Sequence, residues 1–135
     1  MDSRYTLDSF ALLSWFQDER GAKKVDSLIK KAENASIKLW LSIINLGEVY
    51  YIIYRERGVV QAEHSLSVVE NLPIEIVSAD KKLTLRAAEI KANYSLSYAD
   101  AFSAALGIQT DSLVVTGDPE FNSLLKLVGI EWLDR

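Results

Sequence analysis

With 135 residues, 49% of them hydrophobic and 25% charged, the chain is long enough for one compact domain spanning residues 1–135 and too short for a second. The absence of cysteine excludes disulfides and thiolate metal sites, and the single histidine, His64, excludes a histidine cluster, so a metal site would need oxygen ligands. The formal net charge of -4 argues at first sight against a nucleic-acid partner, because phosphate-binding proteins usually carry a basic excess.

The N-terminal residues 1–4 show neither the charged-then-apolar pattern nor the cleavage site of a signal peptide, so we expect a cytoplasmic protein. The most apolar segment, residues 39–54, is shorter than a bilayer-spanning helix and carries Glu48 near its middle. We therefore predict no membrane span.

Strand-like and helix-like patterns alternate along the chain. Short apolar segments that predict strands lie at residues 5–7, 37–41, 74–77, 112–116 and 130–133. Segments with helical spacing lie between them, at residues 9–16, 21–34, 42–57, 59–71, 83–94, 97–108 and 121–127. This order predicts an α/β fold, a three-layer α/β/α sandwich with a central, mostly parallel sheet of four to five strands. Ligands of such sheets bind beyond the carboxyl ends of the strands, where the strand order reverses.

Two aspartates stand at the carboxyl ends of predicted strands. Asp8 follows the first strand, and Asp118 follows the fourth in the sequence Thr116-Gly117-Asp118-Pro119. An aspartate before a proline is also a common helix start, because the carboxylate accepts from free N–H groups and proline suits the first helical position. Asp118 is therefore either a helix cap or a ligand, and the rest of the fold has to distinguish the two.

Glu48 is a third acid in an informative position. Ile44, Glu48 and Ile52 are spaced at i, i+4 and i+8, which predicts that they form one stripe of a helix with Glu48 in apolar surroundings. A buried carboxylate is costly, so it is expected to be protonated, paired with a base or bound to a cation. The alternative is that Glu48 lies on the rim of the buried helix face.

Asp100 is the fourth acid, in the sequence Ser97-Tyr98-Ala99-Asp100, which has the spacing of a helix capping box. Capping alone would explain it. The alanines that follow, at 101, 104 and 105, would however let the helix pack closely on the sheet. Close packing would bring the Asp100 carboxylate near the strand ends.

The four acids and their surroundings together resemble a known family. YTLDSFALLSWF, SIINLGEVYY, SYADAFSAAL and VVTGDPEF resemble, in this order, the motifs of PIN-domain ribonucleases, and by size the chain resembles the VapC-type toxins of toxin–antitoxin pairs. The resemblance spans nearly the whole chain. It departs from the family pattern at Phe10, where a polar residue would be expected after Ser9.

The resemblance implies a site and an activity. It implies that Asp8, Glu48, Asp100 and Asp118 form an acidic site for Mg2+ or Mn2+, with Thr116 in the catalytic set and Ser9 in support, and Glu120 as an outside candidate. Hard divalent cations prefer such carboxylate oxygens, and they assist phosphodiester hydrolysis. The implied function is a metal-dependent endoribonuclease with RNA as substrate, an antitoxin protein as partner and a homodimeric assembly.

The metal site would also answer part of the charge objection. Of 19 acidic residues, removing these four leaves 15, which balances the 15 lysines and arginines. The candidate phosphate contacts among these basic residues are Lys23, Lys24, Lys30, Lys31, Arg55, Arg57, Lys81, Lys82 and Arg86. The aromatic run VYYIIY exceeds what one helix face can bury, which also favours a homodimer.

Other functional classes fit less well. An aspartyl phosphatase would need a second aspartate at the position of Phe10, a receiver domain would need paired acids near the first strand, and a dinucleotide-binding domain would need a G-x-G-x-x-G motif. The alternatives that stay open are a PIN-like module that binds a partner without catalysis and a PIN nuclease of RNA processing. We expect His64 at the surface, and the three tryptophans in the core or an interface: Trp15, Trp40 and Trp132.

Overall fold

The computed structural model describes residues 3–133, which form five strands, six α-helices and one 3-10 helix. In chain order the elements are β1 (Arg4–Leu7), α1 (Ser9–Phe16), α2 (Ala22–Glu33), β2 (Lys38–Ser42), α3 (Ile43–Arg57), α4 (Val59–Glu70), β3 (Glu75–Val77), α5 (Lys81–Asn93), α6 (Tyr98–Thr110), β4 (Leu113–Thr116), η1 (Pro119–Leu124) and β5 (Ile130–Trp132). The five predicted strands and the first six predicted helices are present, with bounds that differ by a few residues. The α/β fold class is thus confirmed.

The sheet is parallel throughout, with the strand order β3-β2-β1-β4-β5. The chain begins in the middle, builds outward through β2 and β3, and then returns to the other side of β1 to add β4 and β5. The strand order therefore reverses between β1 and β4. In open parallel sheets this is where a ligand crevice forms, beyond the carboxyl ends of the two strands.

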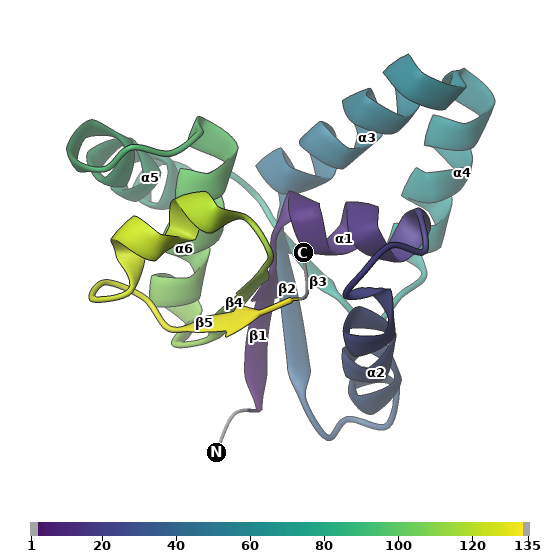
Figure 1. The fold of residues 1–135 in the computed structure, drawn as a ribbon, viewed down its shortest axis with the longest axis horizontal. Coiled ribbons are helices and arrows are strands. Elements are labelled where there is room, and N and C mark those ends of the chain that lie inside the picture. The colour runs from purple at the N-terminus through teal and green to yellow at the C-terminus, as the bar shows by residue number, and fades with distance from the viewer. Residues whose placement is uncertain (1–2, 134–135) are drawn as a thin grey trace.

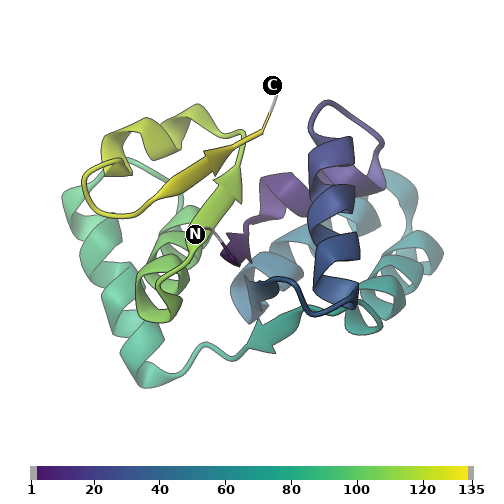
Figure 2. The ribbon, with the colours of Figure 1, turned by 90° about the horizontal axis from the view of Figure 1, so that it is seen from below.

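Helices cover both faces of the sheet, as Figure 1 shows with α1 to α4 on one side and α5 and α6 on the other. Each layer has its own buried cluster: Leu12, Val25 and Val49 belong to the first, and Phe102 and Leu106 to the second. The view from below in Figure 2 shows the chain crossing from the first layer to the second along β3 and the segment after it. The three-layer arrangement follows from this crossing.

α6 packs closely on the sheet, as its alanines predict. Ala101, Ala104 and Ala105 are completely buried. A side chain at Gly107 would meet the Val114 Cγ2 atom at 2.7 Å, so a Cβ at this position would force α6 away from β4. Small residues along α6 therefore hold its first turn, which carries Asp100, against the strand ends.

The predicted last helix differs most from the structure. Residues 121–127 were expected to be helical, but η1 is a 3-10 helix that begins at Pro119, where proline is accepted at the first helical position, and ends at Leu124. His64 is exposed as predicted, Trp40 is buried, and Trp15 and Trp132 are half-buried. No helix within residues 3–133 combines the length and apolarity needed to cross a membrane.

Candidate functional site

The strand order places Asp8 and Asp118 side by side. Asp8 directly follows β1, Asp118 comes two residues after β4, and β1 pairs with β4 in parallel. Both acids thus lie at the carboxyl edge of the sheet, where the strand order reverses. The sequence prediction that these two strand ends share a site agrees with this placement.

Asp8 is completely buried and uses only one of its carboxylate oxygens. Its Oδ1 atom caps α1 by accepting from the Ala11 backbone N–H at 2.8 Å. Its Oδ2 atom is buried, and none of the described residues donates to it. Burial raises the pKa of Asp8 from 3.8 to about 7, opposed by the nearby Thr116 hydroxyl and by the hydrogen bond from the Ala11 N–H, and assisted by the charges of Asp118 and Glu48. A buried carboxylate oxygen without a donor marks this as a place for a cation or a proton.

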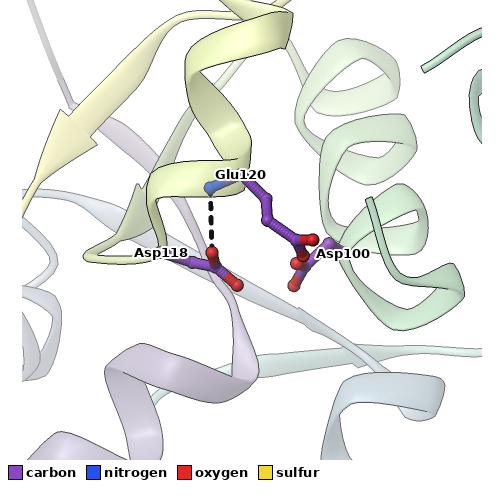
Figure 3. Close-up of side chains that lie close together, drawn as sticks. All are labelled: Asp100, Asp118 and Glu120. Carbon is purple, nitrogen blue, oxygen red and sulfur yellow. Dashed lines mark hydrogen bonds between the residues drawn. The ribbon is translucent and has the colours of Figure 1, made fainter. Parts of the chain in front are cut away.

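Asp118 is a helix cap, and the cap uses only one of its oxygens. Its Oδ1 atom accepts from the Glu120 N–H at 2.9 Å, while its own N–H donates to Thr116 Oγ1 at 2.9 Å. Figure 3 shows the rest of the carboxylate turned toward Asp100. Gly117, between Thr116 and Asp118, leaves room for the Phe10 ring, because a Cβ there would lie 2.4 Å from the Phe10 Cε1 atom and the ring would have to move. The cap therefore holds the carboxylate in an orientation that leaves one oxygen available.

Asp100 enters from the other side, on the first turn of α6. Ser97 caps this helix by accepting from the Asp100 N–H at 3.1 Å, which confirms the capping role predicted for Ser97. The Asp100 side chain is only 6% exposed. Burial, the hydrogen-bonded contact with the Asp118 carboxyl group and the charges of Asp8 and Asp118 raise the pKa of Asp100 to about 9. Near neutral pH Asp100 therefore holds a proton unless a cation replaces it.

Glu120 joins this group more closely than the sequence suggests. One carboxylate oxygen from each of Asp100, Asp118 and Glu120 lies within 4.8 Å of the others, and Figure 3 shows the Glu120 and Asp100 carboxyl groups side by side. The tight 3-10 turn after Asp118 brings Glu120 back over the strand end. In the sequence, only its position two residues after the candidate ligand Asp118 pointed to Glu120. The geometry of the turn is what brings its carboxylate to the other acids.

Glu48 lies at the edge of the site. The predicted buried stripe of Ile44, Glu48 and Ile52 is wrong, because Ile44 is 36% exposed and α3 buries the neighbouring stripe instead. The residues of that buried stripe are Asn45, Leu46, Val49 and Ile53. Glu48 is half-buried beside it, outside the group of three acids within 4.8 Å, yet near enough for its charge to raise the pKa of Asp8. The structure therefore favours the alternative that Glu48 lies on the rim of the buried helix face.

Ser9 and Asn45 form a buried hydrogen-bonded pair next to Asp8. Ser9 is buried next to Asp8, and its Oγ atom accepts from Asn45 Nδ2 at 2.9 Å. Asn45 also donates to the Ala99 carbonyl, at 3.2 Å. The sequence reading proposed Ser9 as a supporting residue and missed Asn45, although an asparagine inside an otherwise apolar helix turn is a usable signal.

The acids have no basic partner among residues 3–133. The ion pairs of this part of the chain join Lys24 to Glu131 and Lys30 to Asp26, both away from the acids. The nine candidate phosphate contacts are exposed. Two of them, Lys24 and Lys30, take part in these ion pairs. The converging acids offer carboxylate oxygens, and Asp8 Oδ2 has no hydrogen-bond partner among the described residues, which fits a hard divalent cation such as Mg2+ or Mn2+.

Comparison with known proteins agrees with this geometry. The family model of the PIN domain matches residues 5–126. The chain belongs to the PIN-domain family. No match is found among curated proteins.

Solved PIN-domain structures share the fold at low sequence identity. VapBC2 from Rickettsia felis, bound to a promoter DNA fragment, has a TM-score of 0.75 at 18% identity, over 97% of this chain and 99% of the other. VapC20 of Mycobacterium tuberculosis, a toxin that cleaves the Sarcin-Ricin loop, has a TM-score of 0.69 at 16% identity, over 90% and 94%. DNA-bound VapBC from Salmonella typhimurium has a TM-score of 0.68 at 20% identity, over 97% and 98%. The structural neighbours of this PIN domain are thus VapC toxins of VapBC complexes.

Proposed function

We propose that this PIN domain is a Mg2+- or Mn2+-dependent endoribonuclease and the toxin of a toxin–antitoxin pair. The observation that carries the proposal is the Asp8 carboxylate, completely buried at the strand-order reversal with one oxygen that has no hydrogen-bond partner among the described residues. Asp100, Asp118 and Glu120 converge beside it without a basic partner among the described residues. The likeness to VapC20 in fold supports RNA as the substrate class.

The residues of such a site would have different roles. Asp8, Asp100 and Asp118 would hold the cation, with Glu120 beside Asp100 and Asp118 as a further candidate ligand and Glu48 as an acidic group at the rim. A bound divalent cation supplies Lewis-acid polarisation of a phosphodiester and lowers the pKa of water. Thr116 fixes the loop of Asp118 by accepting its N–H, and its hydroxyl stabilises the ionised form of Asp8. The raised pKa values of Asp8 and Asp100 mean that loading the site displaces protons, so occupancy should increase with pH.

Partners follow from the same surface chemistry. An antitoxin that supplies an arginine or lysine to the acids would compete with the cation and inhibit the enzyme. Several solved relatives, including the Rickettsia felis and Salmonella typhimurium proteins, are VapBC structures. Exposed apolar residues on α3 and the start of α4 support a homodimer through this face: Ile43, Ile44, Tyr51, Tyr54, Val59 and Val60. A partner-binding PIN module without catalysis is the competing function.

RNA cleavage by single-charge variants tests the proposal. Asp8→Asn and Asp100→Asn each keep the shape of the side chain but remove a charged ligand. Since changes to groups that only support metal ligands cost about 10- to 100-fold in affinity or activity, we expect each variant to lose more than about 100-fold of the Mn2+-dependent cleavage of a structured RNA panel. Circular dichroism checks that the variants are folded.

Asp80→Asn is the matched control. Asp80 also caps a helix, α5, by accepting from the Leu83 N–H at 2.8 Å, but it is exposed and belongs to no acidic group among the described residues. This variant should cleave like wild type. Wild-type turnover by folded Asp8→Asn or Asp100→Asn would refute the assignment of the site, and a wild-type protein that binds its antitoxin but cleaves no RNA would favour the non-catalytic module.

A further inference from the structure

Asn45 connects the separate segments that carry the acids. It lies in the first turn of α3, is completely buried, and donates from its Nδ2 atom to Ser9 Oγ at 2.9 Å and to the Ala99 carbonyl at 3.2 Å. The Ser9 hydroxyl in turn lies 3.4 Å from the Asn45 backbone carbonyl and donates to it. One side chain thereby bridges α1, α3 and α6.

The residues joined by these hydrogen bonds are close in sequence to the acids. Ser9 is the residue after Asp8, Ala99 is the residue before Asp100, and Asn45 stands one helical turn before Glu48. We propose that Asn45 is a positioning residue that fixes the separation of the Asp8 and Asp100 carboxylates, so that they accept a divalent cation without rearrangement. The inference rests on the proposed metal site and adds to it a residue that does not touch the metal.

Local stability does not explain an asparagine here. Ser42 already caps α3 by accepting from the N–H groups of Ile44 and Asn45, so the Asn45 side chain is not needed as a cap. Its Oδ1 atom is buried, and no described residue donates to it, which is a cost that an apolar side chain would avoid. A buried polar group that carries such a cost is typical of residues that serve a site.

The acids lie on separate segments of the chain. Asp8 stands between β1 and α1, and Asp100 stands in the first turn of α6. The two hydrogen bonds of the Asn45 amide link these segments, between the start of α1 and the start of α6. Hydrogen bonds weaken steeply when their distance or angle changes, so they fix the relative position of two segments more narrowly than apolar contacts do.

Manganese binding to Asn45→Leu tests the inference. Leucine has a similar volume and suits a helix, but it donates no hydrogen bond. The dissociation constant of Mn2+, measured without RNA from the paramagnetic resonance signal of the free ion, should rise by about 10- to 100-fold. With a cleavable RNA and saturating Mn2+, kcat should fall while KM for the RNA stays near the wild-type value.

Thr6→Val is the matched control for a lost buried hydrogen bond. Thr6 is completely buried in β1, the strand that ends just before Asp8. Its hydroxyl is hydrogen-bonded to Ser112 Oγ at 2.7 Å. This variant should lower the melting temperature yet leave the Mn2+ dissociation constant unchanged. A folded Asn45→Leu protein that binds Mn2+ as tightly as wild type would overturn the inference.

Ser9→Ala is a second test, which stands alone if Asn45→Leu does not fold. It removes one acceptor of the amide and should by itself weaken Mn2+ binding. Where Asn45→Leu folds, Ser9→Ala should weaken binding less than Asn45→Leu, and the double variant should bind no more weakly than Asn45→Leu alone. An unchanged Mn2+ affinity in Ser9→Ala, or fully additive losses in the double variant, would contradict the role of Asn45. A wild-type protein that binds Mn2+ but cleaves no RNA refutes the proposed nuclease and leaves this role of Asn45 supported by the binding data.

Discussion

Buried polar groups are hydrogen-bonded at one end of the β1–β4 strand pair, whereas at the other end some of them have no partner. Toward the amino ends, Thr6 Oγ1 lies 2.7 Å from Ser112 Oγ, which lies 2.8 Å from Thr110 Oγ1, and Thr110 donates to the Leu106 carbonyl at 2.7 Å. The Arg4 guanidinium closes this end by donating to the Thr110 carbonyl at 2.7 and 2.9 Å. Here each hydroxyl has a partner within the chain.

Beyond the carboxyl ends of the same two strands lie buried polar atoms without partners. Asp8 Oδ2 and Asn45 Oδ1 are buried, and no described residue donates to them, while Asp100, Asp118 and Glu120 crowd their carboxylates together. Both ends lie in one tightly packed domain, so burial alone does not force polar groups to stay unpaired. The difference indicates that the carboxyl end is arranged for a ligand and the amino end for stability.

The largest expected difference between the two ends is in the pH dependence of stability without metal. Asp8 has a pKa of about 7 in the folded protein against 3.8 as its ordinary value, so the folded state binds more protons between these pH values. Stability should therefore fall as pH rises from about 4 to about 7, by roughly 4 kcal/mol from Asp8 alone. Asp100, with a pKa of about 9, should extend the fall toward pH 9.

Urea denaturation in EDTA across this pH range measures the effect. Asp8→Asn should remove much of the fall between pH 4 and 7, because an amide does not titrate. It also removes a charge that raises the pKa of Asp100. If wild type and Asp8→Asn lose stability in parallel over this range, the Asp8 carboxyl group is not perturbed in the folded protein.

The next effect concerns Asp118 and separates capping from charge crowding. Two carboxylates about 4 Å apart repel by up to about 4 kcal/mol at an effective dielectric constant near 20, before protons or ions relieve it. Asp118→Asn keeps a good capping side chain and relieves this repulsion. It should melt higher than wild type in EDTA near neutral pH, and millimolar Mn2+ should raise its melting temperature less.

The helix cap Asp80 again supplies the control. Asp80→Asn removes the same charge at the start of α5, away from the acidic group, and should lower stability by at most some tenths of a kcal/mol through the lost helix-dipole interaction. Its Mn2+ shift should equal that of wild type. Equal melting temperatures and equal Mn2+ shifts for Asp118→Asn and wild type would show that Asp118 serves only as a cap.

The smallest effect is expected at the amino end. Thr6→Val removes the hydroxyl that pairs with Ser112, and it should cost about 1 kcal/mol, the typical net value of a buried hydrogen bond. Because this end has no part in metal binding, the loss should be the same in EDTA and in Mn2+. A loss that depends on Mn2+ would contradict the separation of the two ends.

The sequence predicted the fold well because its signals are local. Alternating strand and helix patterns, the break at Gly58 and the caps at Ser97 and Asp118 all act within a few residues, and the structure has each of them. Because the strands are parallel, their carboxyl ends all lie at the same edge of the sheet. The sequence therefore predicted Asp8 and Asp118 at the same edge of the sheet, and the pairing of β1 with β4 makes their strands neighbours.

The site was predicted less completely because it depends on how segments converge. The position of Glu48 depended on which stripe of α3 faces the core, and the packing selected Asn45 and Val49, a stripe beside the predicted one. Glu120 depends on the tight turn of η1, and Asn45 on the meeting of three helices. Asp118 shows why motifs alone were ambiguous, since one of its oxygens caps the helix and the other faces Asp100.

A crystal of the protein grown with Mn2+, with anomalous diffraction recorded near the manganese absorption edge, tests the central claim most directly. The account predicts an anomalous peak at the carboxyl edge of β1 and β4, with oxygens of Asp8, Asp100 and Asp118 about 2.0–2.2 Å from the metal. The same map shows whether Glu48 or Glu120 contributes. Manganese bound only by exposed acids elsewhere, with the Asp8 carboxylate left without it, would contradict the account.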